Sequence, residues 1–178
     1  MGSRPAFTIL EALITMGVLL ASLFLVLGLT VRFMIVSEYS LATINLSDEL
    51  LKASMRIREE LLKIGPRMDT VQLFRNGIEV KGVEGDEVRF EVSIPFGGEE
   101  SFYSKTVRYS IKFDGTEKKV VIMEQKGDKP SVVRVLAENI EDCRFRMLEL
   151  GTISFSIQKR EKRMTRTMSM TVSLFNTK

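Results

Sequence analysis

Two pairs of adjacent acidic residues in the C-terminal two thirds of the sequence are candidates for acid–base chemistry. Asp86 precedes Glu87, and Glu141 precedes Asp142. A paired-carboxylate site needs both groups on one side of the backbone, whereas neighbouring residues of a strand point to opposite faces. We therefore interpret all four acids as solvated surface residues, because acidic side chains are rarely buried.

Other catalytic chemistries lack their usual residues. The chain of 178 residues has no histidine, which removes the commonest general base and the commonest zinc ligand. Its single cysteine, Cys143, excludes an intrachain disulfide and a paired-cysteine metal site, and we expect this residue to be buried. Residues 97–100 lack the spacing of a phosphate-binding loop, and calcium-loop spacing is absent. We expect no catalytic residues, no metal site and no cofactor.

A basic cluster is the strongest candidate for contact with an acidic partner or with DNA, since clustered lysines and arginines attract phosphates. Its members are Lys159, Arg160, Lys162, Arg163 and Arg166. No aromatic side chain is interleaved with them to stack on bases, so we favour a solvated hairpin end over a contact site. The net charge of +3 also gives no indication of a nucleic-acid-binding domain.

Glu11 is the most informative charged residue, because it lies at the beginning of a long apolar segment. Residues 12–31 are twenty uncharged residues, enough for a helix to span a hydrocarbon core of about 30 Å. The apolar core of a cleaved signal is shorter, about 7–15 residues, and ends at a small-residue site. A carboxylate beside this segment costs on the order of a few kcal/mol, so it either has a cationic partner or reaches water at the interface.

The residues around Glu11 resemble the N-terminus of a type IV prepilin. Residues 1–6 (MGSRPA) form a short leader with one basic side chain, and residues 7–13 (FTILEAL) follow it. The resemblance implies cleavage between Ala6 and Phe7 by a prepilin peptidase, and N-methylation of Phe7. It also implies that Glu11 pairs with the freed amine in a filament core. Ala6 departs from the pattern, because the family usually has glycine before the cleavage site.

This resemblance implies a minor pilin or pseudopilin, a structural subunit of a type IV pilus or of a type II secretion pseudopilus. Its partners would be other pilins, the prepilin peptidase and the inner-membrane assembly platform, with nucleic acid a partner only in a DNA-uptake (competence) pilus. The chain would cross the inner membrane once, with a cytoplasmic N-terminus, before it joins an extracytoplasmic filament. The alternative is a membrane-anchored periplasmic or extracellular binding domain that enters no filament.

One long helix is predicted from Phe7 to Ile64, since this segment lacks proline and Gly65-Pro66 is a strong stop signal. Residues 7–36 would be its transmembrane half and residues 37–65 its amphipathic half. We expect a charged arc to face water or another subunit, formed by Asp48, Glu49, Lys52, Arg56, Glu59, Glu60 and Lys63. We expect the apolar residues to pack on a sheet, namely Leu46, Leu50, Ile57, Leu61 and Ile64 with Ile44, Leu51, Met55 and Leu62.

Residues 66–178 change to a pattern with a period of two, which is typical of strands. Asn76-Gly77 predicts a hairpin between residues 71–75 and 78–83. Further strands are predicted at residues 88–96, 107–113, 120–123, 132–136, 153–157 and 168–174, with a loop at residues 126–130. Residues 134–145 resemble the segment before the last strands of W-type minor pilins and J-type minor pseudopilins. The fold class is therefore α+β, with a long N-terminal helix packed on an antiparallel, β-rich head.

Overall fold

The computed structural model describes residues 8–64, 70–96, 103–126, 129–148, 151–161 and 164–174. They form one helix, α1 (Ile9–Leu62), followed by strands in the order β1 (Gln72–Arg75), β2 (Ile78–Val80), β3 (Glu87–Phe96), β4 (Tyr103–Asp114), β5 (Lys119–Lys126), β6 (Lys129–Ala137), β7 (Asp142–Leu148), β8 (Thr152–Glu161) and β9 (Met164–Ser173). This confirms the predicted α+β class, in which a long helix packs against antiparallel strands. The chain divides into two compact units, Met1–Ile44 and Asn45–Lys178, so α1 continues from the first into the second.

Between residues 12 and 31, α1 carries only uncharged and mostly apolar side chains. Its most apolar 18 residues have a mean hydropathy of 2.5, and α1 is long and apolar enough to cross a membrane. Large side chains such as Leu13, Phe24 and Phe33 are exposed. The hydroxyl groups in this segment donate to carbonyls of the preceding turn, as Ser22 Oγ does to Leu19 O at 2.8 Å and Thr30 Oγ1 to Val26 O at 2.8 Å. Such bonds satisfy the hydroxyl groups within the helix itself.

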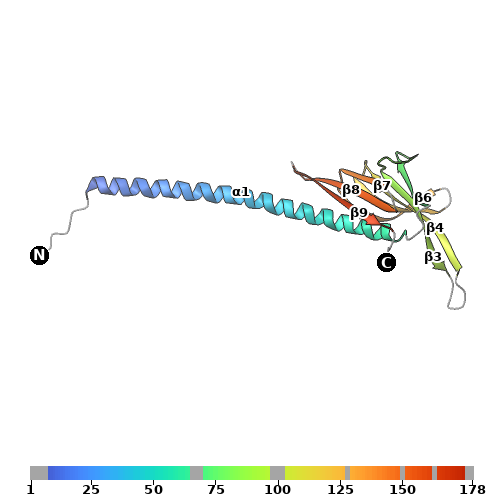
Figure 1. Ribbon diagram of the computed structural model, residues 1–178. Helices are drawn as coiled ribbons and strands as arrows, with labels where there is room; N and C mark the ends of the chain where they lie inside the picture. Colours follow the sequence, from blue (N-terminus) through green and yellow to red (C-terminus); the bar gives the residue numbers. More distant parts are fainter. Residues whose placement is uncertain are drawn as a thin grey trace. The chain divides into compact units, whose positions relative to one another are not determined.

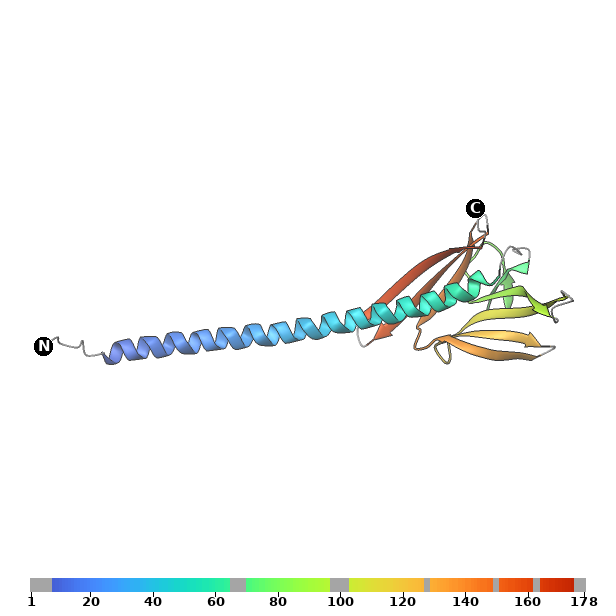
Figure 2. The same cartoon turned by 90° about the horizontal axis from the view of Figure 1, so that it is seen from below.

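The second unit contains two antiparallel sheets and the C-terminal part of α1 (Figures 1 and 2). The larger sheet has the strand order β2-β1-β3-β4-β5-β6, and the smaller has the order β7-β8-β9. The predicted hairpin at Asn76-Gly77 is confirmed, because these residues connect β1 to β2 with φ angles of 52° and 79°. A main-chain bridge between Gly85 and Phe145 links the two sheets.

The hydrophobic core lies between α1 and both sheets. Leu50, Ile57 and Leu61 of α1 belong to one buried cluster with residues of the larger sheet such as Val88 and of the smaller sheet such as Phe155. Cys143 is also in this cluster, which confirms its predicted burial. The helix therefore contributes the layer that both sheets share.

The buried face of α1 is narrower than we predicted. Leu46, Leu50, Ile57, Leu61 and Ile64 are buried as expected, but Ile44, Leu51, Met55 and Leu62 are between 43% and 62% exposed. A helix that lies along a sheet buries only the side that faces it, and residues at the border of a wide apolar arc remain outside. Small Ala53 and Ser54 occupy the centre of the contact instead.

Glu60 also differs from the prediction that the whole charged arc faces solvent. Its side chain is only 5% exposed, and its carboxylate forms ion pairs with Arg134 of β6 and with Lys63 Nζ, the latter at 2.8 Å. Paired cations offset the unfavourable burial of a carboxylate. The other residues of the arc are exposed as expected.

Two strand predictions need correction. Strand β7 was missing from the strands we predicted, although Cys143, Phe145 and Met147 alternate with polar residues in the same way as residues of the other strands. The predicted loop at residues 126–130 is shorter, since β5 continues to Lys126 and β6 begins at Lys129. The two strands remain paired as far as Lys126 and Lys129, which are partners in the register. The polar residues of this segment gave no sign that the strands extend so far.

Candidate functional sites

Glu11 and Thr8 together form the N-terminal cap of α1. Thr8 precedes the first helical residue, and its backbone nitrogen and Oγ1 each donate to Glu11 Oε2 at 3.1 Å. In return the backbone nitrogen of Glu11 donates to Thr8 Oγ1 at 3.3 Å. This reciprocal arrangement is a capping box, whose signature is a threonine or serine three residues before a glutamate. Our interpretation of Glu11 from its apolar neighbours missed that spacing.

The capping box fixes the place of the Glu11 carboxylate in the first turn of α1. Negative charge is favourable there, because the helix dipole leaves a partial positive charge at the N-terminus. Of the two carboxylate oxygens of Glu11, only Oε2 accepts hydrogen bonds from the described residues. Oε1 is therefore available to a further donor. The predicted processing residues Ala6 and Phe7 lie outside the described residues.

The predicted basic cluster lies at the end of the β8–β9 hairpin, although its described members differ in their surroundings. Lys159 and Arg166 form a cross-strand pair. The side chain of Lys159 is only 14% exposed and forms an ion pair with Glu49 of α1, whereas Arg166 is exposed. Lys162 and Arg163 lie outside the described residues. Lys159 therefore connects the hairpin to α1 and is not a free surface charge.

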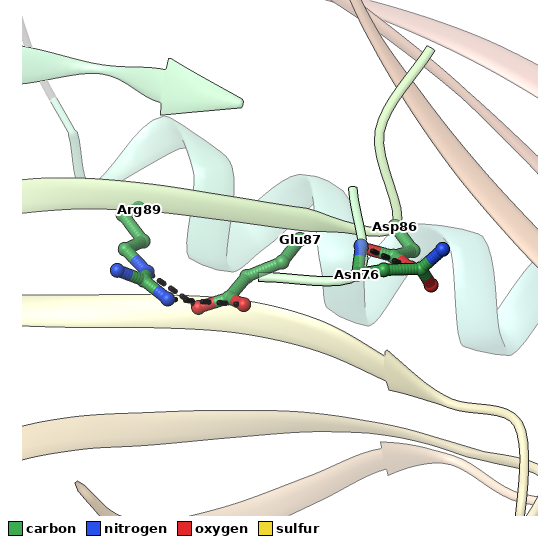
Figure 3. A network of polar contacts seen from close by, with 4 residues as sticks. All are labelled: Asn76, Asp86, Glu87 and Arg89. Carbon is green, nitrogen blue, oxygen red and sulfur yellow. Dashed lines mark hydrogen bonds and ion pairs between the residues drawn. The ribbon is translucent and has the colours of Figure 1, made fainter. Parts of the chain in front are cut away.

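The acidic pair Asp86 and Glu87 is divided between two separate contacts (Figure 3). The Asp86 carboxylate accepts hydrogen bonds from the backbone nitrogen of Asn76 at 3.1 and 3.2 Å. Glu87 Oε1 accepts from Arg89 Nε at 2.7 Å, and the Arg89 guanidinium lies 3.8 Å from the centre of the Phe74 ring. Glu87 is only 4% exposed, so our surface interpretation was wrong for this residue. The ion pair with Arg89 offsets the free-energy cost of burying this carboxylate, and the Phe74 ring in turn stabilises the Arg89 guanidinium.

The second acidic pair is likewise divided. Lys118 Nζ donates to Glu141 Oε1 at 2.8 Å, and this hydrogen bond, with a smaller contribution from the charge of Arg160, lowers the pKa of Glu141. Asp142 instead forms an ion pair with Arg144, whose Nε lies 2.9 Å from Oδ1. Glu141 and Asp142 each bind a different cation. In neither acidic pair do the two carboxylates form a common site for proton transfer.

Cys143 and the acidic residues form no metal centre in the described part of the chain. No three histidine, cysteine, aspartate or glutamate side chains group closely enough there to hold a metal ion. Burial raises the pKa of the Cys143 thiol far above its ordinary value, with a smaller contribution from Asp142. A thiol that stays protonated is a poor nucleophile and a poor metal ligand.

Comparisons of this chain with models of protein families, with curated proteins and with solved structures returned no match.

Proposed function

We propose that this chain is a pilin-like structural subunit, a minor pilin or pseudopilin of a type IV pilus or of a type II secretion pseudopilus. The observation that carries the proposal is the position of Glu11, whose carboxylate is held in the first turn of α1 directly before twenty uncharged residues. In an apolar surrounding, a carboxylate at the border of such a segment costs on the order of a few kcal/mol unless a cation pairs with it.

The pairing of Glu11 with a cleaved N-terminus follows from charge balance. Cleavage before Phe7 would create an amine one residue away from the capping residue Thr8. A cation at that end of a helix is opposed by the helix dipole, so it needs a nearby anion. In an apolar surrounding, the amine of one subunit and the Glu11 carboxylate of a neighbour would each provide the charge that the other lacks.

The exposed apolar side chains of α1 support the same proposal. In the membrane they would contact lipid, and in a filament they would contact the equivalent helices of neighbouring subunits. We propose that the chain first crosses the inner membrane with its N-terminus in the cytoplasm, in agreement with Arg4 on that side. The chain would then act by assembly and not as an enzyme, with the prepilin peptidase, other pilins and the assembly platform as partners.

The intact mass of the protein extracted from its native membrane tests the processing step. We expect a chain that lacks residues 1–6 and carries one additional methyl group. A chain that retains residues 1–6 would contradict the proposal.

Filament incorporation tests the role of Glu11. We expect Glu11→Val to abolish incorporation while the near-ultraviolet circular dichroism of the second unit stays unchanged. Thr8→Ala is the matched control, because it removes half of the capping box and leaves the carboxylate in place. Equal loss of incorporation in both variants would assign Glu11 to helix capping alone.

A membrane-anchored binding domain that enters no filament is the second candidate. The capping box favours it, because Thr8 already provides hydrogen-bond donors to Glu11 within the same chain. This alternative predicts that residues 1–6 are retained and that Glu11→Leu leaves the function of the protein unchanged.

A further inference from the structure

Three arginines line one hollow at the junction of the two sheets. The hollow has a volume of about 290 Å³, and its lining consists of Arg75, Arg144 and Arg146 with Gly82, Val83 and Glu84. Arg75 is the last residue of β1, and Arg144 and Arg146 belong to β7. Residues two apart on a strand point to the same face, so the two β7 arginines share one side, opposite buried Phe145.

The positive charge of this arginine hollow is only partly compensated by nearby carboxylates. Arg144 has a partner, since its Nε lies 2.9 Å from Asp142 Oδ1. The side chains of Arg75 and Arg146 are exposed and form no ion pair or hydrogen bond with the described residues. Glu84 is the only acid in the lining, and it too has no ion pair within the described part of the chain. Two guanidinium groups without an ion pair, those of Arg75 and Arg146, thus stand beside one lining carboxylate, that of Glu84.

Main-chain hydrogen bonds hold the walls of the hollow in place. Gly85 and Phe145 exchange two hydrogen bonds of 2.8 Å, and the nitrogen of Asp86 donates to Phe74 O at 2.9 Å. The Asp86 carboxylate also binds the backbone nitrogen of Asn76 (Figure 3).

Each of these bonds lies directly beside a lining residue. Arg75 stands between Phe74 and Asn76, and Phe145 stands between the two β7 arginines. The backbone atoms that carry the three guanidinium groups are therefore fixed before any ligand arrives, which reduces the entropy lost on binding.

We propose that the arginine hollow binds an oxyanion, a carboxylate or phosphate group. The planar guanidinium fork matches both groups with two parallel hydrogen bonds, which is why arginine predominates where such anions are recognised. Pockets for whole small molecules measure about 300–1,000 Å³, so this hollow fits one anionic group with a few attached atoms. That group comes either from free phosphate or from an acidic side chain of a protein partner. This inference does not depend on the proposed function.

Titration of the full-length protein in detergent micelles tests the site. The probes are inorganic phosphate, acetate and a blocked tri-glutamate peptide, each added at constant ionic strength, and the readout is the NMR signal of the arginine Nε–Hε groups. We expect saturable shifts of the Arg75 and Arg146 signals. Loss of two charge-assisted contacts in the double variant Arg75→Gln/Arg146→Gln should weaken binding by about tenfold or more. The control variant Arg108→Gln, whose arginine lies on β4 and pairs with Glu91, should keep the full affinity.

The three probes also separate the sources of the anion. Saturation by phosphate or acetate supports a site for a free oxyanion, and saturation by the peptide alone supports an acidic segment of a protein partner. Shifts of the wild-type signals that rise linearly with all three probes would overturn the proposal, whatever the variants do. Equal affinity of the wild type and the double variant would overturn it as well.

Discussion

Arg134 on the edge strand β6 forms an ion pair with the buried carboxylate of Glu60 on α1. Lys63 binds the other oxygen of the same carboxylate at 2.8 Å. Nearer the N-terminal end of α1, Glu49 forms an ion pair with Lys159 of β8. The C-terminal part of α1 is thus attached by charge to one strand of each sheet, in addition to the apolar core that it shares with them.

Replacement of Arg134 by methionine should destabilise the head. The variant keeps an alkyl chain but removes one of the two cations of buried Glu60, and we expect the free energy of unfolding to fall by about 1–2 kcal/mol. The effect is smaller than for a fully buried pair, because the Arg134 side chain is 55% exposed and Lys63 remains. Urea unfolding followed by near-ultraviolet circular dichroism measures it. Arg108→Met, whose partner Glu91 is nearer the surface, should change stability by less than about 1 kcal/mol, and equal losses would contradict the assigned role of Glu60.

Gly85 should tolerate no side chain. A Cβ atom at this position would lie 2.5 Å from the carbonyl oxygen of Phe74. This oxygen is backbone and accepts a hydrogen bond from the Asp86 nitrogen at 2.9 Å, so moving it aside would weaken that bond. We expect Gly85→Ala to lower the free energy of unfolding by roughly 2–3 kcal/mol. Gly115→Ala is the control, since a Cβ there meets only the Phe113 ring at 3.7 Å. Thermal unfolding with no difference between the two variants would show that the sheet junction adapts.

Cys143 should make stability fall at high pH. Burial raises the pKa of its thiol, so the folded protein keeps a proton that the unfolded chain loses near the ordinary pKa of 9.0. The resulting stabilisation is fully present below pH 9 and declines above it, by up to about 1.4 kcal/mol per pH unit. Denaturant titrations at several pH values measure this decline, and Cys143→Ala should make it shallower.

The same burial predicts the reactivity of the thiol. Iodoacetamide at pH 8 should leave the folded protein unmodified and should alkylate Cys143 after denaturation. Rapid alkylation of the folded protein, or a decline with pH that is equally steep in Cys143→Ala, would contradict the buried position of this thiol.

Local patterns were sufficient for the fold class and for the places of most elements. The uncharged run after Glu11 and the absence of proline predict the helix, and Asn76-Gly77 predicts the first hairpin because only a few residue types adopt positive φ angles. These features depend on neighbouring residues alone. Strand β7 had the same kind of pattern around Cys143 and was overlooked. The capping box of Thr8 and Glu11 was equally visible in the sequence.

The tertiary structure alone decided which charged residues are buried and which arginines meet. Glu60 looks like any surface acid in the sequence, because its partner Arg134 lies 74 positions later in the chain. Arg89 lies only two residues from Glu87, but the burial of Glu87 depends on how the strands pack. The arginine hollow likewise brings Arg75 together with two residues of β7 that lie about seventy positions later in the chain. Periodicity determines which side of an element is apolar, whereas partners distant in sequence determine what a polar side chain contacts.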